Sequence, residues 1–586
     1  MPAVKLCTVC GVLTSRPGSR CTAHARQSNR SRHNALYSTR AWQRLSARVL
    51  RAWRGERGNW CPGYRRGAHP AADLTVDHVV PLAAGGAPFD IGNTAVLCRS
   101  CNSTKGASTD RGGVAQKVTP QRELSSAPSQ CRRPEVGVDI VGDLRARTRG
   151  EVLAPRDGGY EAARAAYNAL ATGQPAYIFR PADVPDIVAA VRWAVEVDLP
   201  IGVRGGGHSV AGHSSPNGAL LVDLSRWRGA VVDPVARTAE ALAGSRLMDL
   251  DAATAAHTLA APSGTFIDTG IGGLTLTGGI SWILASQGFA CDALIGAKMV
   301  TIDGDVIDID DQHEPELLWG LRGGGGNFGI VTHLRYALTP VPRMFGGALR
   351  FRGAGIRDVI MRAFEIEATA PDELVLAIVA WRGEDGSPGI SVNFAWRGDP
   401  DAGAAAVRAL TDHQALFESD VKAMSWLQQQ AQYAPIPFGL RQYWKGHLVG
   451  KLDETLADAL IAAAADASES SFCLVELIHG VAHRIPEASA AFGGRAAVAN
   501  VTALAIWNDA EADEREIAWA RRMADSVAPL SLRGGGYLNY PELDQTAARV
   551  AAAFPSATWD RLRQLKRRLD PANRLRFNAN IPPADG

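Results

Sequence analysis

The chain has 586 residues, more than one hydrophobic core usually organises, so two or three domains are expected. Its composition is that of an ordinary globular protein, and no apolar run approaches membrane-spanning length. The charge is uneven: residues 1–120 hold 18 Lys and Arg against 5 Asp and Glu, about +13, whereas the remainder is about −11. The basic segment favours nucleic acid as a partner, and the acidic remainder is typical of a soluble enzyme.

Six of the nine cysteines lie in the basic segment, where the spacing Cys-x-x-Cys recurs. No apolar signal segment stands at the start of this sequence, so these pairs favour zinc ligands in a reducing compartment over disulfides. We therefore expect a soluble cytoplasmic protein. One complete set of four zinc ligands is formed by Cys7, Cys10, Cys21 and His24.

A second zinc set is centred on Cys98 and Cys101, which should join Cys61 and a fourth ligand. The usual second Cys-x-x-Cys pair is broken, because Tyr64 stands where another thiolate is expected. His69 is the nearest substitute ligand. The alternative is that His69 is a loop histidine in an Ala-His-Pro turn without a metal.

An apolar strand, Leu74-Thr-Val-Asp77-His78, is followed by Asn93 and Asn102. This order, over residues 36–106, resembles the HNH endonucleases and implies a small ββα fold that grips one metal ion. By resemblance, His78 activates the attacking water and Asn93 orients His78. Asp77 and Asn102 would hold Mg²⁺ or a similar divalent cation. Family members often have His where Asn102 stands, so weakened activity is expected, although an amide oxygen still binds a hard cation.

Four arginines beside the nuclease-like motif are predicted to lie on one basic helix: Arg44, Arg48, Arg51 and Arg54. Such a helix suits contacts to phosphates without base specificity. A solvated charged face is the alternative. The absence of any acidic residue before Glu56 favours DNA as a partner.

Residues 107–137 have the composition of a linker, with Gly and Ser but no apolar periodicity. Beyond them the pattern predicts helices and strands in alternation, namely a helix over 160–171, a strand over 176–179, a helix over 184–197 and a strand over 201–203. From about 345 to 508, strands such as 374–381 alternate with helices such as 456–464. This is typical of an antiparallel sheet that carries a substrate surface, so an α+β fold is expected.

Three glycine clusters stand between residues 204 and 329: Arg204-Gly-Gly-Gly-His208, Gly270-Ile-Gly-Gly-Leu-Thr-Leu-Thr-Gly-Gly279 and Arg322-Gly-Gly-Gly-Gly-Asn-Phe-Gly329. A backbone that approaches a large anionic ligand closely needs residues without side chains. Repeated glycine runs between strands therefore indicate a nucleotide or dinucleotide lying along loops. The guanidinium of Arg204 would add positive charge beside a pyrophosphate.

The order of these clusters resembles the vanillyl-alcohol oxidase type of FAD-binding domain and, more narrowly, the berberine-bridge-enzyme-like oxidoreductases. The resemblance covers about residues 140–583 and includes the terminal motifs Tyr537-Leu-Asn-Tyr540 and Asn578-Ala-Asn-Ile-Pro582. It implies a PCMH-type FAD-binding fold of two subdomains with an antiparallel-sheet substrate domain. The expected organisation is an HNH-like zinc domain over 1–106, a linker over 107–137, the FAD-binding domain over 138–343, the substrate domain over 344–530 and a returning segment over 531–586.

By resemblance, His208 matches a histidine that is bonded covalently to the flavin, and the alternative is a histidine beside a non-covalent flavin. A second link through cysteine is not expected, because Phe266 follows Gly264-Thr265 and cannot form a thioether. Cys291 and Cys473 are simpler as small core residues. The expected FAD-binding residues are Arg204, Gly205, Gly206, Gly207, His208, Ser209, Gly272, Gly273, Thr275, Gly278, Gly279, Asn327, Gly329, Ile330, Asn578 and Asn580.

Thr277 stands where the family usually has glycine, and it would crowd the cofactor if its backbone adopted a positive φ. Oxidation of an alcohol also needs a base for the hydroxyl proton. By resemblance this is Tyr537 or Tyr540, with Asn539 orienting, provided that a positive neighbour lowers the tyrosine pKa. Alternatively these tyrosines only close the flavin pocket.

The main expected function is an FAD-dependent oxidase that removes hydride from a hydroxyl-bearing carbon of a small organic substrate, with O₂ as acceptor by resemblance. A metal-dependent HNH endonuclease is the alternative or a second activity. A fused reading frame and a degenerate DNA-binding appendage also explain the N-terminal module. Lys445 and Arg495 are left out of the site, because single basic residues are usually solvated.

Overall fold

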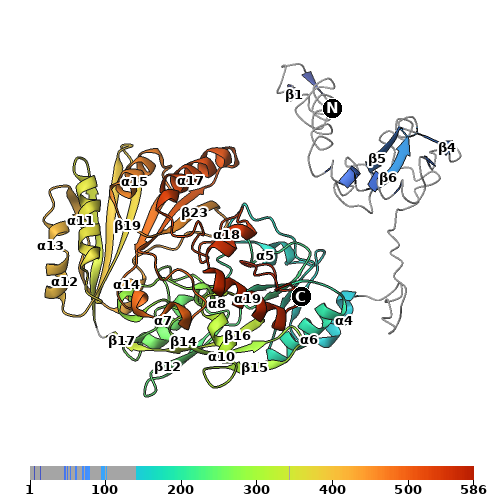
Figure 1. The fold of residues 1–586 in the computed structure, drawn as a ribbon, viewed down its shortest axis with the longest axis horizontal. Coiled ribbons are helices and arrows are strands. Elements are labelled where there is room, and N and C mark those ends of the chain that lie inside the picture. The colour runs from blue at the N-terminus through green and yellow to red at the C-terminus, as the bar shows by residue number, and fades with distance from the viewer. Residues whose placement is uncertain are drawn as a thin grey trace. The chain divides into compact units, whose positions relative to one another are not determined.

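The computed structural model describes residues 140–341 and 343–585 continuously (Figure 1). Nearer the N-terminus it describes short stretches only: 5–6, 13–14, 42, 45–47, 49–50, 53, 60–61, 69–71, 73–78, 94–98 and 101. The chain divides into two compact units, residues 1–133 and 134–586. Among the described helices, none is both long and apolar enough to cross a membrane.

The described part of the first unit consists of short antiparallel strand pairs. Strand β5 (Leu74–His78) pairs with β6 (Thr94–Cys98), and β3 (Trp60–Cys61) pairs with β4 (His69–Pro70). Strands β1 (Lys5–Leu6) and β2 (Leu13–Thr14) form another pair. Trp42, Val49 and Trp53 are buried with the residues of β5 and β6 in one small core. Arg44, Arg48, Arg51 and Arg54 lie outside the described residues, so the predicted basic helix stays a prediction.

The second unit begins with a small mixed sheet in the order β7-β8-β10-β9. The strands are β7 (Glu151–Leu153), β8 (Tyr177–Arg180), β9 (Ile201–Arg204) and β10 (Leu220–Asp223). The accompanying helices are α4 (Ile140–Arg147), α5 (Tyr160–Arg164) and α6 (Val184–Glu196). Asp183 precedes α6 and caps it, because its carboxylate accepts a hydrogen bond from the backbone amide of Asp186. This predicted helix therefore has a standard N-cap.

The helix predicted over 160–171 is too long, because α5 ends at Arg164. Beyond it, the side chain of Asn168 donates to the carbonyls of Val210 and Gln442, both at 2.7 Å. The amide of Ala169 donates to the carbonyl of Leu440. These long-range hydrogen bonds hold the segment in an irregular, non-helical path with a turn after Asn168, so tertiary contacts override its alanine-rich helix propensity.

A second, antiparallel sheet follows in the order β11-β12-β16-β14-β15. Its strands are β11 (Ala230–Asp233), β12 (Thr238–Leu242), β14 (Leu294–Val300), β15 (Val306–Ile309) and β16 (Ile330–Ala337), and β13 (Leu259–Ala260) pairs separately with β17 (Thr339–Pro340). Four helices connect them: α7 (Leu247–Ala255), α8 (Ile271–Thr277), α9 (Leu284–Gln287) and α10 (Pro315–Leu321).

The predicted antiparallel substrate sheet is present as one large sheet in the order β21-β18-β20-β19-β24-β25-β23, with β22 beside β18. Its strands are β18 (Met344–Arg352), β19 (Leu374–Arg382), β20 (Pro388–Arg397), β21 (Leu416–Ser419), β22 (Lys422–Met424), β23 (Arg441–Val449), β24 (Phe472–Leu477) and β25 (Ala499–Trp507). The α+β class is therefore confirmed.

Helices α11 (Ile356–Ala368), α15 (Glu454–Asp466) and α17 (Asp513–Val527) lie along one face of this sheet (Figure 1). Shorter helices are α12 (Pro400–Ala406), α13 (Arg408–Thr411), α14 (Trp426–Gln430) and α16 (Val481–Arg484). The opposite face packs against residues 280–291 of the FAD-binding region in a separate core. Alternate side chains of each strand thus serve two different layers.

The C-terminal helices α18 (Ala547–Ala552) and α19 (Ser556–Leu569) return to the first two sheets. At the end of α19 the ammonium of Lys566 is fully buried and donates to the carboxylate of Asp570 at 2.7 Å. It also donates to the carbonyls of Asn327 and Leu575. One buried cation therefore ties the third glycine cluster to the last segment of the chain.

We expect Asp570→Ala to reduce the free energy of unfolding by about 3–5 kcal/mol, because it leaves the Lys566 ammonium buried without its counter-charge. Arg568→Ala is the matched control on the same helix, since its exposed ion pair with Glu314 contributes less than about 1 kcal/mol. Denaturant unfolding of the full chain, followed by tryptophan fluorescence, measures both. Equal small losses in the two variants would contradict the role of the clamp.

Candidate active site

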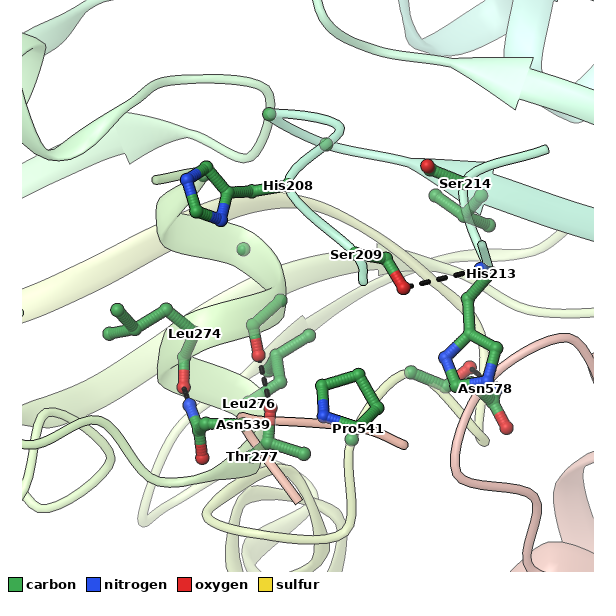
Figure 2. A pocket seen from close by; sticks show the side chains of 18 of the residues that line it. His208, Ser209, His213, Ser214, Leu274, Leu276, Thr277, Asn539, Pro541 and Asn578 are labelled. Carbon is green, nitrogen blue, oxygen red and sulfur yellow. Dashed lines mark hydrogen bonds between the residues drawn. The ribbon is translucent and has the colours of Figure 1, made fainter. Parts of the chain in front are cut away.

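The three glycine clusters and the C-terminal segment line one cavity (Figure 2). Most of the residues expected to bind FAD lie in its wall: Arg204, Gly205, Gly206, Gly207, His208, Ser209, Gly272, Gly273, Gly279, Gly329 and Asn578. The wall also contains the tyrosines and the asparagine of the terminal motif, Tyr537, Asn539 and Tyr540. Residues more than 300 positions apart in the sequence thus meet around one space.

Two glycines allow backbone segments of the cavity wall to pack closely against each other. A Cβ atom on Gly206 would lie 2.4 Å from the Cα of Gly270, and one on Gly272 would lie 2.7 Å from the carbonyl oxygen of Ala243. These glycines are therefore required by the packing of one loop on another. Gly273 differs, because a Cβ there would meet no atom within 4 Å. It borders open cavity, where a ligand can approach the backbone.

Five of the expected FAD-binding residues lie behind the cavity wall. Thr275 shares a 2.8 Å hydrogen bond with the hydroxyl of Tyr336, and Ile330 is buried at the start of β16. A Cβ on Gly278 would lie 2.9 Å from the amide oxygen of Asn539. Asn327 and Asn580 complete the five, and Asn327 donates to the carbonyls of Gly324 and Ala579 and accepts the amide of Ile581. These residues hold the wall in place.

Arg204 is committed to the protein more than we expected. Its Nε donates to the carbonyl of Ser214 at 2.9 Å, and one Nη donates to the carbonyl of Ala163 at 2.5 Å. Asp223 lies 3.6 Å away as its counter-ion. Burial lowers the pKa of Arg204, and its second Nη has no hydrogen-bond partner. Only that nitrogen remains to interact with a ligand.

Thr277 does not adopt the positive φ angle that would make it crowd the cofactor. Thr277 is the last residue of α8, and the positive φ angles of 147° and 95° fall on Gly278 and Gly279. Its hydroxyl donates to the carbonyl of Gly273 within the helix (Figure 2). Thr277 is therefore accommodated without strain, because the two glycines that follow it make the turn.

His208 lies in the cavity wall, and other side chains contact its ring on several sides. The ring stacks on Tyr167, with centroids 3.9 Å apart, and presents an edge contact to Phe438. Its Nε2 lies 3.5 Å from the carboxylate of Asp268. Phe266, at the position that would carry a second covalent link, stacks on Tyr433. Cys291 and Cys473 are fully buried, as expected of core residues.

A second histidine, His213, lines the same cavity and was not singled out from the sequence. Its backbone amide donates to the hydroxyl of Ser209, which fixes the loop after the first glycine cluster (Figure 2). Burial lowers the pKa of His213 to about 4, so its imidazole is neutral at pH 7. A histidine in a Gly-His-Ser sequence gave no signal that separated it from an ordinary loop residue.

The tyrosines of the terminal motif are not activated in the way we expected. Tyr537 accepts the amide of Gly279 at 2.9 Å, and Tyr540 donates to a carboxylate oxygen of Glu476 at 3.1 Å. Burial and then the nearby charge of Glu476 raise the pKa of both tyrosines well above the usual value. Within residues 140–341 and 343–585, no cationic side chain hydrogen-bonds to either hydroxyl, so the predicted lowering of the tyrosine pKa is wrong.

Asn539 also has a different role from the expected orientation of a tyrosine. Its amide nitrogen donates to the carbonyl of Leu274 at 2.8 Å and ties the terminal motif to α8 (Figure 2). Two basic residues excluded from the site are engaged elsewhere. Lys445 pairs with Glu542 at 2.7 Å, and Arg495 forms a buried ion pair with Asp292.

Glu476 is the titratable residue that the sequence analysis missed. It lies on β24, is 3% exposed and accepts hydrogen bonds from Asn500 at 2.8 Å and from Tyr540. Burial raises its pKa to about 7, although both hydrogen bonds act in the opposite direction. A single acidic residue in the apolar run Phe472-Cys-Leu-Val-Glu-Leu477 was the available signal.

The cavity residues fit a large polar cofactor. Several buried polar atoms around it have no hydrogen-bond partner within the described part of the protein: the second Nη of Arg204 and the amide oxygens of Asn539 and Asn578. Buried polar groups are normally satisfied, so such a set on one wall indicates a ligand with many hydrogen-bonding atoms. Together with the open face of Gly273, this wall can hold the phosphates and ring of a flavin nucleotide.

In the first unit, three of the predicted zinc ligands meet. The sulfur atoms of Cys61, Cys98 and Cys101 lie within 4.8 Å of one another, and all three residues are buried. The amide of Cys98 donates to the sulfur of Cys61, and the amide of Cys101 donates to the sulfur of Cys98. The strand register sets His69 opposite Cys61. This thiol cluster is typical of a structural zinc site.

The remaining predicted residues of the first unit cannot be compared with the structure in the same way. Asp77 and His78 occupy the last two positions of β5, opposite Ala95 and Thr94 of β6. Their side chains are not described. Asn93, Asn102, and the set Cys7, Cys10, Cys21 and His24 lie outside the described residues.

Comparison with protein families agrees with this architecture. Residues 175–310 match the family described as FAD binding domain, residues 536–582 match berberine and berberine like, and residues 67–116 match HNH endonuclease. The fold and the cavity thus define an FAD-linked oxidoreductase with an HNH segment at its N-terminus.

Similar proteins cover the second unit almost completely. The chain is 28% identical over 452 residues to (R)-6-hydroxynicotine oxidase of Paenarthrobacter nicotinovorans. The match covers 74% of this chain and 97% of the oxidase. It is 28% identical to the FAD-linked oxidoreductase aurO of Gibberella zeae over 76% of this chain and 87% of the relative. The crystal structure of 6-hydroxy-D-nicotine oxidase from Arthrobacter nicotinovorans superposes with a TM-score of 0.70 at 26% identity, covering 75% of this chain and 98% of that one. The second unit is thus similar in sequence and in fold to the berberine-bridge-enzyme-like FAD-linked oxidoreductases.

Proposed function

We propose that the second unit oxidises a hydroxyl-bearing carbon of a small organic substrate, with O₂ as the electron acceptor. The observation that carries this proposal is the hydrogen bond from Tyr540, which lines the cavity, to the buried carboxylate of Glu476. An alcohol oxidation needs a proton acceptor beside the carbon that loses hydride, and this pair supplies one. The similarity to oxidases supports the class of reaction.

The bound FAD supplies the acceptor for the hydride. The chain's own task is to remove the hydroxyl proton. Because the pKa of Tyr540 is high, a free phenolate is not the base. Tyr540 instead accepts the substrate proton while it passes its own proton to the carboxylate of Glu476, 3.1 Å away. Asn500 holds the second carboxylate oxygen at 2.8 Å and so fixes the direction of the relay.

This relay predicts a pH dependence. Only the ionised carboxylate of Glu476 accepts a proton, so the rate of flavin reduction should rise as the pH increases through about 7, the raised pKa of this group. Glu476→Gln should lower the rate by about 10²- to 10⁴-fold and abolish that inflection. Stopped-flow measurement of flavin reduction gives both the rate and its pH dependence. The substrate for it is first found by screening hydroxylated sugars, alkaloids and polyketides for peroxide release.

Glu516→Gln provides the control, because Glu516 is also buried and hydrogen-bonded. It lies on α17 and accepts hydrogen bonds from Ser468 and Ser471, and it does not line the cavity. Glu516→Gln should keep the wild-type pH profile. An unchanged inflection in Glu476→Gln would contradict the relay.

We also propose a single covalent bond between His208 and FAD. His208 reaches the cavity, and Phe266 leaves no thiol for a second bond. The acid-denatured wild-type protein should therefore form a yellow pellet, and His208→Ala should leave any flavin in the supernatant. His213→Ala alters the other cavity histidine and should keep the pellet yellow. A visible spectrum of each fraction measures this, and a colourless wild-type pellet would contradict the bond.

A second activity is proposed for the first unit, because three of its cysteines, Cys61, Cys98 and Cys101, form a thiol cluster. We infer that Zn²⁺ is held there with His69 as the fourth ligand, and at the Cys7, Cys10, Cys21 and His24 set. Asp77 and Asn102 would then hold Mg²⁺, and His78 with Asn93 would activate water for cleavage of DNA. Thiolate zinc ligands suit a reducing compartment, so we place the protein in the cytoplasm.

Metal analysis and a nicking assay test this activity. Cys98→Ser should remove one equivalent of zinc from the full chain, whereas Cys473→Ser, a buried cysteine of the second unit, should remove none. Mg²⁺-dependent nicking of plasmid DNA should be lost in Asp77→Ala and in His78→Ala. Nicking that persists in both variants would come from a contaminant, and an unchanged zinc content in Cys98→Ser would exclude the thiol site.

A further inference from the structure

Side chains that can carry positive charge are few in the wall of the cavity. Among the residues that line it, they are Arg204, His208 and His213, and none of the lining residues is an aspartate or a glutamate. The pyrophosphate of FAD is an anion, and burial of an anion is costly unless a counter-charge or hydrogen-bond donors accompany it. These three side chains are therefore the candidates for its counter-charge.

Two of the three candidates already have a carboxylate partner. Asp223 lies 3.6 Å from Arg204, and Asp268 lies 3.5 Å from Nε2 of His208. Within the described part of the second unit, no carboxylate pairs with the imidazole of His213 and no group hydrogen-bonds to it. Burial is the only cause of its lowered pKa. His213 is thus the basic side chain of the wall that has no counter-ion in the protein.

His213 lies beside the free nitrogen of Arg204. It belongs to the loop that joins β9 to β10, and its backbone amide is held at 3.2 Å by the hydroxyl of Ser209. The Nε of Arg204 donates to the carbonyl of Ser214, the next residue along this loop. The second Nη of Arg204, which has no partner, therefore borders the same part of the wall. Two cationic donors can meet one anionic group there.

The ends of the cavity differ in the residues that they present. Figure 2 shows His208 on the left, above Asn539 of the terminal tyrosine motif, whereas His213 and Asn578 lie on the right. The left side carries the residues suited to the flavin ring. In FAD the pyrophosphate is separated from that ring, so the right side suits the phosphates. The C-terminal segment adds Phe577 and Asn578 to the wall, and neither of them titrates.

We propose that His213 is the counter-charge for the pyrophosphate of FAD and that its imidazole takes up a proton from solvent as the cofactor binds. Burial alone keeps the ring neutral, since its pKa is about 4. An anion beside the ring favours the charged form. The protonated ring then donates a charge-assisted hydrogen bond to a phosphate oxygen. The proposal concerns reversible binding of FAD and does not depend on the covalent bond proposed at His208.

Proton uptake makes the affinity for FAD depend on pH. Between the pKa of about 4 and the raised pKa of the FAD-bound protein, each bound FAD brings a proton with it. The affinity should therefore increase as the pH falls through this window, by up to about tenfold per pH unit. Below the window the ring is protonated with or without FAD, and above it in neither case. Riboflavin, which has the ring but no phosphate, should bind without this dependence.

The test is isothermal titration calorimetry on the full chain with His208→Ala, in which FAD binds reversibly. This background is needed because a covalent bond, once formed, holds FAD even when the reversible affinity is lower. Titrations between about pH 5 and pH 8, in buffers of different ionisation enthalpy, should show proton uptake with FAD and none with riboflavin. Adding His213→Gln should abolish the uptake and weaken FAD binding on the order of 10- to 100-fold at the acidic end. Riboflavin binding should stay unchanged.

His447→Gln is the matched control on the same background. Burial is also the main cause that lowers the pKa of His447 to about 4. His447 lies on β23, however, and does not line the cavity. His447→Gln should therefore keep both the proton uptake and the affinity for FAD.

The outcomes separate the possible failures. FAD binding without proton uptake overturns the proposal before His213 is altered. Uptake that persists in His213→Gln assigns the proton to another group and overturns it too. Equal weakening of FAD and riboflavin binding means that His213 merely supports the wall. Phosphorus NMR of the FAD-loaded protein with His208 intact is the second measurement: a phosphate signal should shift with pH, and a shift that is absent, or that survives His213→Gln, overturns the proposal.

Discussion

The cavity depends on the contact between the backbones of Gly206 and Gly270. These residues belong to loops that follow strands of two different sheets, and their Cα atoms approach so closely that neither position accepts a side chain. This contact holds the first glycine cluster against the start of α8. The histidine loop and the first turn of α8 then share one wall, and the ligand-facing glycine, Gly273, lies beside them. A methyl group at the contact would separate the two halves of the site.

The buried basic residues near this wall are paired mainly with groups of the protein itself. Arg204, Arg495 and Lys566 are all buried, and most of their donors are satisfied by carboxylates or carbonyls of the protein. Their charge is thus largely balanced within the protein, and one Nη of Arg204 stays available to a ligand. The groups left for chemistry are an imidazole, two phenols and the carboxylate of Glu476. Reactivity in such a site comes from burial and from proton relays between neighbouring residues, since no free cation faces the tyrosines within the described second unit.

Much of the fold could be predicted, because periodicity and glycine spacing are local properties of the sequence. The helix at 184–197, the strands at 201–203 and 374–381, and the convergence of the glycine clusters followed from such patterns. The helix over 160–171 failed because Asn168 hydrogen-bonds to residues as far away as Gln442. For the same reason the hydrogen-bond partners that Arg204, Asn327 and Asn539 have within the protein were not foreseen. Their partners lie on segments whose proximity no local pattern encodes.

The candidate base illustrates the same limit. Residue types identified the tyrosines, but the pKa of a tyrosine depends on which charge lies beside it, and here that charge is the carboxylate of Glu476 on a strand 64 residues away. Asp268 was likewise not recognised from the sequence, because only the folded chain places its carboxylate 3.5 Å from Nε2 of His208. Sequence spacing can nominate a titratable residue, whereas its protonation behaviour is set by burial and by neighbours brought together in the folded chain.

The clamp formed by Lys566, Asn327 and the segment up to Ile581 also bears on how the protein matures. The third glycine cluster leaves the ribosome some 240 residues before the helix that fixes it, and the tyrosines of the wall emerge near the end of synthesis. Chains are made at roughly 5–20 residues per second, so about 10–50 seconds pass before the helix that closes this wall is made. Flavin capture is therefore an event of the completed chain, and a polypeptide cut short by a few dozen residues would be made without its cofactor.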